Sequence, residues 1–116
     1  MKKITAIIQP SKFEALKEKL IEGGVCGLTV SNVEGYGFQK SKLNAVKSKS
    51  VKDLSIELLP KIMMEIVVKD EDVEKIVEII TSSIRTGRIG DGKIFISDIT
   101  GIIRIRTGER DEDALQ

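Results

Sequence analysis

Apolar and polar side chains alternate, or β-branched residues cluster, in several segments of the chain, and we expect each of these segments to form a β-strand. The three clearest are residues 2–8, 28–33 and 62–68. Near the C-terminus, residues 93–99 and 102–106 have the same character and are also expected to be extended.

Two other segments repeat apolar residues at three- and four-residue spacing, which is typical of one buried helix face. The first repeat consists of Phe13, Leu16 and Leu20, and the second consists of Val73, Ile76, Val77, Ile80 and Ile84. Residues 11–14 form a capping-box pattern before the first helix, and Gly23 and Gly24 supply its stop. Asp70 is expected to cap the second helix.

The predicted order is β-α-β-β-α-β, an α+β ferredoxin-like arrangement with both helices on one face of an antiparallel sheet. Residues 62–68 and 93–99 are apolar on both sides, whereas two helices cover only one face. The other face therefore needs a cover, and a second copy of the same chain is the expected one. This pattern alone predicts a homo-oligomer.

Between the second and third strands, residues 37–59 show little apolar periodicity and form a loop too long for a hairpin turn. Its basic residues are Lys40, Lys42, Lys47, Lys49 and Lys52, with no acid before Asp53. Two interpretations stay open: a solvated, mobile loop, or a basic arm that docks a partner.

The amino-acid composition excludes several classes of function. The 116 residues suit one domain, and 19 Lys and Arg against 18 Asp and Glu give no basic field for nucleic acid or an anionic membrane. No apolar run could span a bilayer, so we expect a cytoplasmic protein without membrane insertion. Histidine is absent, which removes the commonest general base and metal ligand.

The strongest chemical feature is the glycine-rich segment TGRIGDGK at residues 86–93. Its glycines allow close backbone approach, successive amides can bind an anion, and Lys93 adds a charge. Gly87 to Lys93 also fits G-x-x-x-x-G-K, but Ile94 stands where a P-loop needs Ser or Thr, and a strand follows instead of a helix. A phosphate site and a glycine-rich hairpin without ligand both remain open.

Arg104 and Arg106 are two residues apart on a predicted strand, so their guanidinium groups should share one face. Bidentate arginine suits phosphate, and a polyphosphate between them would offset their charge. A structural pairing with Asp91 or Asp98 is the competing explanation.

The chain resembles the PII family of signal-transduction proteins. The segments that carry the resemblance are MKKITAIIQP at the start, GLTVSNVEGYGFQK at 27–40, LPK at 59–61, TGRIGDGKIFISDI at 86–99 and IIRIRTGERDEDAL at 102–115. The resemblance implies one domain over residues 1–116, a homotrimer, and ATP or ADP sites between neighbouring subunits. It also implies a T-loop at residues 37–59 that contacts a target protein, and a C-terminal tail at residues 107–116.

Matched residue by residue, the resemblance implies a nucleotide site and a site for Mg²⁺ and 2-oxoglutarate. The implied nucleotide-binding residues are Gly27, Thr29, Gly37, Phe38, Gly87, Arg88, Gly90, Asp91, Gly92, Lys93, Arg104 and Arg106. Gln39 would help hold Mg-ATP and 2-oxoglutarate, and Lys61 would pair with a carboxylate of the keto acid. Such a dicarboxylate beside ATP needs a cation and a metal to offset repulsion.

The chain departs from the family pattern in its loop. Phe38 replaces a frequent Arg or Lys, Ser41 replaces a frequent glycine, and residues 41–58 lack the ELYRG segment with its modifiable tyrosine. Uridylylation is therefore not expected. The resemblance leaves an ammonium channel, another transporter, nitrogenase or a nitrogen-metabolism enzyme as candidate partners.

Three functions are set against each other. The favoured hypothesis is a sensor in which ATP and ADP compete and each ligand set biases the loop; an ATP/ADP sensor without 2-oxoglutarate is its variant. The second is a slow nucleotide phosphohydrolase in which Asp91 or Glu65 positions water. The third is a structural trimeric adaptor with degenerate sites.

Overall fold

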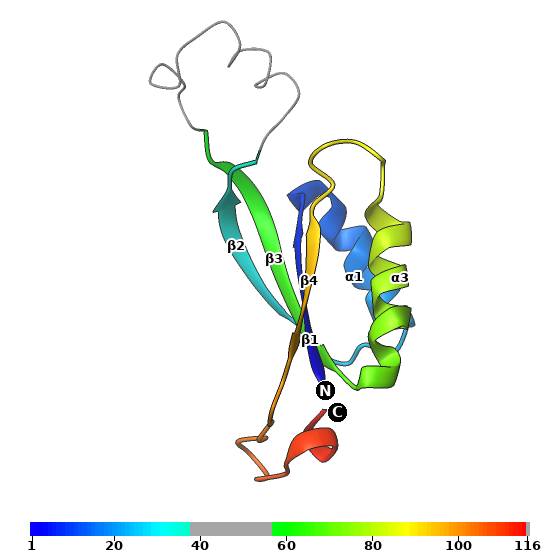
Figure 1. The fold of residues 1–116 in the computed structure, drawn as a ribbon, viewed down its shortest axis with the longest axis vertical. Coiled ribbons are helices and arrows are strands. Elements are labelled where there is room, and N and C mark those ends of the chain that lie inside the picture. Colours follow the sequence, from blue (N-terminus) through cyan, green and yellow to red (C-terminus); the bar gives the residue numbers. More distant parts are fainter. Residues whose placement is uncertain (38–56, 116) are drawn as a thin grey trace, which may run out of the picture.

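The computed structural model describes residues 1–37 and 57–115, and it has two layers, a sheet and a pair of helices (Figure 1). The elements follow the order β1 (Lys2–Ile8), α1 (Phe13–Glu22), β2 (Thr29–Gly35), β3 (Leu59–Val68), α3 (Val73–Ile84) and β4 (Lys93–Asp98). The spatial strand order is β2-β3-β1-β4, and every neighbouring pair is antiparallel. The predicted α+β ferredoxin-like fold is confirmed.

The hydrophobic core lies between the helices and one face of the sheet. Strand β1 alternates, with Ile4, Ala6 and Ile8 buried, and its register places them opposite Ile66, Met64 and Ile62 of β3. The helix residues buried against this face are Leu16, Leu20, Val73, Ile76, Ile80 and Ile84. These include most of the residues that the helical spacing picked out.

The second face of the sheet, which we call the helix-free face, is mixed in character. Ile7, Met63 and Val67 project from it by strand alternation, and Phe95 of β4 is 54% exposed. Lys3 and Glu65 form an ion pair on it, with Nζ and Oε2 3.2 Å apart. Within the described residues both helices lie on the opposite side (Figure 1), so neither of them covers this face.

The helix starts differ from the predicted caps. Each α-helix is preceded by a one-turn 3-10 helix, Pro10–Lys12 or Asp70–Asp72, and neither start has a side-chain cap hydrogen bond. Ser11 lies inside its 3-10 turn, and so the capping-box prediction is wrong. Asp70 instead forms an ion pair with the N-terminal amine, whose nitrogen lies 2.8 Å from Oδ1 of Asp70. The hydrogen bond from this amine, followed by its positive charge, lowers the pKa of Asp70.

The predicted strand at 102–106 is largely wrong. Only Ile103 makes a β-bridge, to Arg110, and residues 105–107 form a turn. Gly108 causes the reversal: its φ is 75°, and its N–H donates to the Arg104 carbonyl at 2.7 Å. Residues 99–115, which we call the C-terminal arm, therefore fold back as a hairpin that continues beyond β4 (Figure 1).

The long loop predicted at residues 37–59 falls mostly on residues 38–56, which lie outside the described residues. Its predicted end is slightly wrong, because β3 already begins at Leu59. In the part of the chain that the structure describes, neither helix has the length and apolar character needed to cross a bilayer.

Candidate functional site

The glycine loop, residues 86–93, joins α3 to β4 at the end of the sheet where β2 ends and β3 begins (Figure 1). Gly87, Gly90 and Gly92 have φ values of 81°, 105° and 112°. Side chains rarely adopt such backbone conformations, so the glycines make this loop shape possible.

Gly92 is under the tightest constraint. A Cβ added there would lie 2.0 Å from the Ile7 carbonyl oxygen, closer than any real contact. The loop therefore packs directly on the end of β1, and this close approach fixes where its backbone begins β4.

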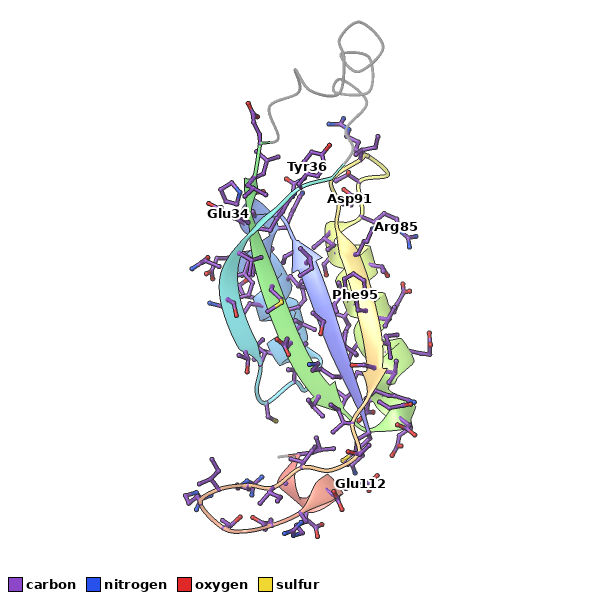
Figure 2. All side chains as sticks on the ribbon, turned by 60° about the vertical axis from the view of Figure 1, so that its left-hand side comes forward. Glu34, Tyr36, Arg85, Asp91, Phe95 and Glu112 are labelled. Atoms are coloured by element: carbon purple, nitrogen blue, oxygen red, sulfur yellow. The ribbon has the colours of Figure 1, made fainter. Side chains whose placement is uncertain are left out.

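A groove of about 520 Å³ runs between the glycine loop and the ends of β2 and β3. Its lining residues are Ile7, Gly35, Tyr36, Gly37, Leu59, Lys61, Ile89, Gly90, Gly92, Lys93 and Phe95. Tyr36 and Phe95 lie near the open face of the sheet (Figure 2), and their side chains are about half exposed, 47% and 54%. An apolar wall with two lysines and a glycine loop can take a flat apolar group and a polyanion.

The Asp91 carboxylate organises the loop. It accepts hydrogen bonds from the Thr86 hydroxyl and from the backbone N–H of Thr86 and Gly87, at 2.8 and 2.9 Å for the two amides. The Thr86 hydroxyl is the main cause of a lowered pKa for Asp91, followed by the Thr86 amide. The Asp91 side chain lines smaller cavities next to the groove, and it does not line the groove itself.

Gly27, Thr29 and the two arginines lie away from the groove. Thr29 begins β2, and Gly35 at the far end of that strand lines the groove. Gly27 lines a separate cavity of about 420 Å³ together with Val67, Glu112 and Leu115. The C-terminal arm carries the arginines beyond the sheet end opposite the glycine loop (Figure 1). One chain thus separates the predicted residues that line the groove from Gly27, Thr29 and the arginines.

The arginines do not share a strand face, because Arg106 lies in the turn of the C-terminal arm. Arg104 donates to the Glu109 carboxylate at 2.6 Å, and Thr107 donates to the same carboxylate at 2.7 Å. The Thr107 hydroxyl is the largest cause of a lowered pKa for Glu109, with Arg104 adding to it. The competing explanation, a structural pairing of the arginines with Asp91 or Asp98, is not supported: Asp98 pairs with Lys2, and Asp91 accepts from Thr86 and Gly87.

Some predicted residues are not brought into the groove. Phe38 and Gln39 lie outside the described residues, and Arg88 is exposed and lines a cavity of about 250 Å³ beside Gln9 and Lys12. Among residues 1–37 and 57–115, no three His, Cys, Asp or Glu side chains gather to hold a metal ion.

Three groove or loop contacts escaped sequence reasoning. Tyr36 and Phe95 line the groove, and Gln9 donates from Nε2 to the Gly90 carbonyl at 2.9 Å. An aromatic residue in a strand, such as Phe95, or directly after one, such as Tyr36, has a packing explanation, and a lone glutamine after a strand carries no signal. Only the pairing of β1 with β4 brings Gln9 beside the loop.

Comparison with known proteins gives a consistent result. The family model described as Nitrogen regulatory protein P-II matches residues 1–109. A nitrogen regulatory protein P-II from Pasteurella multocida is 46% identical over 115 residues, which are 99% of this chain and 100% of the relative. Nitrogen regulatory protein P-II 1 from Methanothermobacter thermautotrophicus is 47% identical over 99% of this chain and 97% of its own, and P-II from Porphyra purpurea is 47% identical over 99% and 100%.

Proposed function

The chain belongs to the nitrogen regulatory protein P-II family of signal-transduction proteins, and on that premise we propose that it is a cytoplasmic sensor that binds ATP or ADP and regulates a target protein. Its relatives are named as regulatory proteins. Competing nucleotides would bias the segment between β2 and β3 toward or away from target binding.

The observation that carries the proposal is the division of the predicted nucleotide residues into two half-sites. The first half-site is the groove, with the glycine loop, Lys93 and Lys61. The second is made by Gly27, Thr29 and the arginines at the other sheet end (Figure 1). A nucleotide that needs both must lie between two copies of the chain, which a closed ring of subunits supplies.

We therefore expect a homotrimer. The helix-free face supports this expectation, because both helices lie on the other side of the sheet and Phe95 on this face is 54% exposed among the described residues. Light scattering at micromolar concentration should give three times the 12.8 kDa chain mass. A monomeric mass would refute both the trimer and the nucleotide site shared between subunits.

The groove suits a nucleotide chemically. The glycine loop can present backbone N–H groups to phosphates, Lys93 adds charge, and Tyr36 and Phe95 give an apolar wall. Calorimetric titration with ATP and with ADP tests the proposal directly. Saturable binding of both, with ADP displaced by ATP, is the expected result, and absence of binding to either would overturn it.

The contacts of the two candidate catalytic carboxylates, Asp91 and Glu65, favour a sensor over a phosphohydrolase. Asp91 is engaged by Thr86 and Gly87 and does not line the groove, and Glu65 is paired with Lys3. Neither is placed to activate water beside a γ-phosphate. Phosphate release should stay at background after prolonged incubation with Mg-ATP; turnover at the nucleotide site would favour the phosphohydrolase.

We also propose that 2-oxoglutarate binds only together with Mg-ATP. Lys61 is partly buried and lines the groove, so its ammonium group can meet a carboxylate there. The metal, held mainly by phosphate oxygens and by Gln39, would offset repulsion between two anions.

Calorimetry with protein saturated with Mg-ATP should give a 2-oxoglutarate signal that Lys61→Ala removes. The same titration should be silent with ADP, or with ATP and no Mg²⁺, and these two arms serve as controls. If the wild-type protein with Mg-ATP gives no heat with millimolar 2-oxoglutarate, the chain is a sensor of ATP and ADP alone.

We propose only the class of target protein: an ammonium channel, another transporter, nitrogenase or a nitrogen-metabolism enzyme. Pull-downs with ATP, with ADP and with ATP plus 2-oxoglutarate would identify it, since a true target should be retained in some of these states and released in others.

A further inference from the structure

A set of polar contacts holds the glycine loop from outside the groove. Gln9 donates from Nε2 to the Gly90 carbonyl at 2.9 Å, and the Asp91 carboxylate accepts from Thr86 and Gly87. Gln9, Thr86 and Asp91 together line the cavity of about 250 Å³ beside the loop, and none of the three lines the groove. We call these three residues the latch.

Gln9 fixes the direction of one peptide group. In a trans peptide the carbonyl and the following N–H point in opposite directions. Because the Gly90 carbonyl points to Gln9, the N–H of Asp91 must point away from Gln9. Gln9 therefore fixes, from outside the groove, the orientation of the peptide group that follows Gly90, a residue that lines the groove.

Asp91 and Thr86 close the other half of the loop. One carboxylate gathers two backbone N–H groups and the Thr86 hydroxyl, which also accepts from the Arg88 N–H at 3.2 Å. Hydrogen bonds to an ionised carboxylate are among the stronger ones. They tie down a segment whose three glycines would otherwise lose much conformational freedom when a ligand orders it.

We propose that Gln9, Thr86 and Asp91 are positioning residues, which hold the glycine loop in its anion-binding shape before ligand arrives and so set nucleotide affinity without touching the nucleotide. This inference rests on the proposed function of the loop. It assigns Asp91 a role behind the loop in place of direct phosphate contact, and it adds Gln9 and Thr86 to the site.

The latch should matter more for binding than for folding. Its Thr86 and Asp91 contacts are solvent-exposed, and exposed hydrogen bonds exchange readily with water. Without the latch the loop adopts the binding-competent shape for a smaller fraction of the time. The apparent affinity for nucleotide is the intrinsic affinity multiplied by this fraction, so it falls in proportion. A competent fraction of about one tenth would weaken binding about tenfold.

Thr86→Val and Thr86→Ser form a matched pair for the test. Valine keeps the size of threonine but cannot donate to Asp91, whereas serine keeps the hydroxyl. Gln9→Met removes the donor to Gly90 at similar length. On the full-length trimer, calorimetry with ATP should show about tenfold weaker binding for Thr86→Val and Gln9→Met. Thr86→Ser should stay within about twofold of wild type, and melting temperatures should shift by less than about 4 °C.

Hydrogen exchange on the free protein gives the readout that does not depend on ligand. The amides of residues 87–93 should exchange faster in Thr86→Val than in Thr86→Ser, and exchange in β1 and β3 should not change. If the wild-type protein binds ATP and Thr86→Val binds it with the same affinity, the latch is refuted and the proposed function stands. An equal loss of affinity in the Val and Ser variants has the same meaning.

A wild-type protein that binds no ATP would overturn the proposed function, and with it the effect on affinity. Exchange in the free protein would then decide separately whether the latch orders the loop, and equal exchange in the Val and Ser variants would overturn that part as well.

Discussion

Gly92→Ala is expected to weaken nucleotide binding about 150-fold while the sheet and helices stay folded. The backbone φ of Gly92 is 112°, and an added Cβ would lie 2.0 Å from the Ile7 carbonyl oxygen, a backbone atom that cannot rotate away. Strain of this kind costs about 1–3 kcal/mol, and the clash adds to it, so the loop must leave β1. A total near 3 kcal/mol corresponds to about 150-fold weaker binding.

Two other glycines are controls for this substitution. Gly87 has a φ of 81° but an added Cβ there meets no atom within 4 Å, so Gly87→Ala suffers only the conformational strain and should have a smaller effect. Gly101 has no positive φ, and an added Cβ there would make only an ordinary contact, 3.7 Å from Oδ1 of Asp111. ATP titration should rank the losses as Gly92, then Gly87, then Gly101. Wild-type affinity in Gly92→Ala would show that the loop is not the phosphate site.

Arg106→Ala is expected to weaken ATP and ADP binding by about 1.5–3 kcal/mol, or about 10- to 150-fold, and to leave the trimer intact. Arg106 is exposed in the turn of the C-terminal arm, so the fold should lose little with it. Calorimetry measures the loss, and light scattering checks the assembly. Arg104→Ala is a less clean variant because it also breaks the contact with Glu109. Unchanged affinity, or a dissociated protein, would refute the assignment of Arg106.

Mixed trimers test whether the two half-sites come from different chains. If the proposed half-sites exist, Gly92→Ala damages the one in the groove, and Arg106→Ala damages the one that includes the C-terminal arm at the other sheet end (Figure 1). If each site lies between neighbours, random co-assembly of the two variants leaves about a quarter of the sites with two intact halves. ATP binding should then reappear at near wild-type affinity with that stoichiometry. A site formed within one chain would show no recovery.

Local periodicity was enough to find the main elements. Alternation in β1 and the helical spacing of Val73, Ile76, Ile80 and Ile84 each report which face of an element is buried, and burial is what folding selects. The predictions failed at the ends of elements, where the pattern is weakest. The capping box at residues 11–14 gave way to a 3-10 turn, and the strand at 102–106 to a hairpin turned by Gly108.

The glycine loop could likewise be located from sequence, because clustered glycines mark backbone conformations that other residues rarely adopt, although its ligand stayed open. What only the tertiary structure decided was which residues meet it. Antiparallel pairing of β1 with β4 sets Gln9 beside Gly90, and the C-terminal arm carries the arginines away from the glycine loop (Figure 1). The contacts of Asp91 with Thr86 and Gly87 hold its carboxylate outside the groove. Sequence patterns report each element's own faces, whereas these distances depend on strand register between segments about 80 residues apart, which no local pattern encodes.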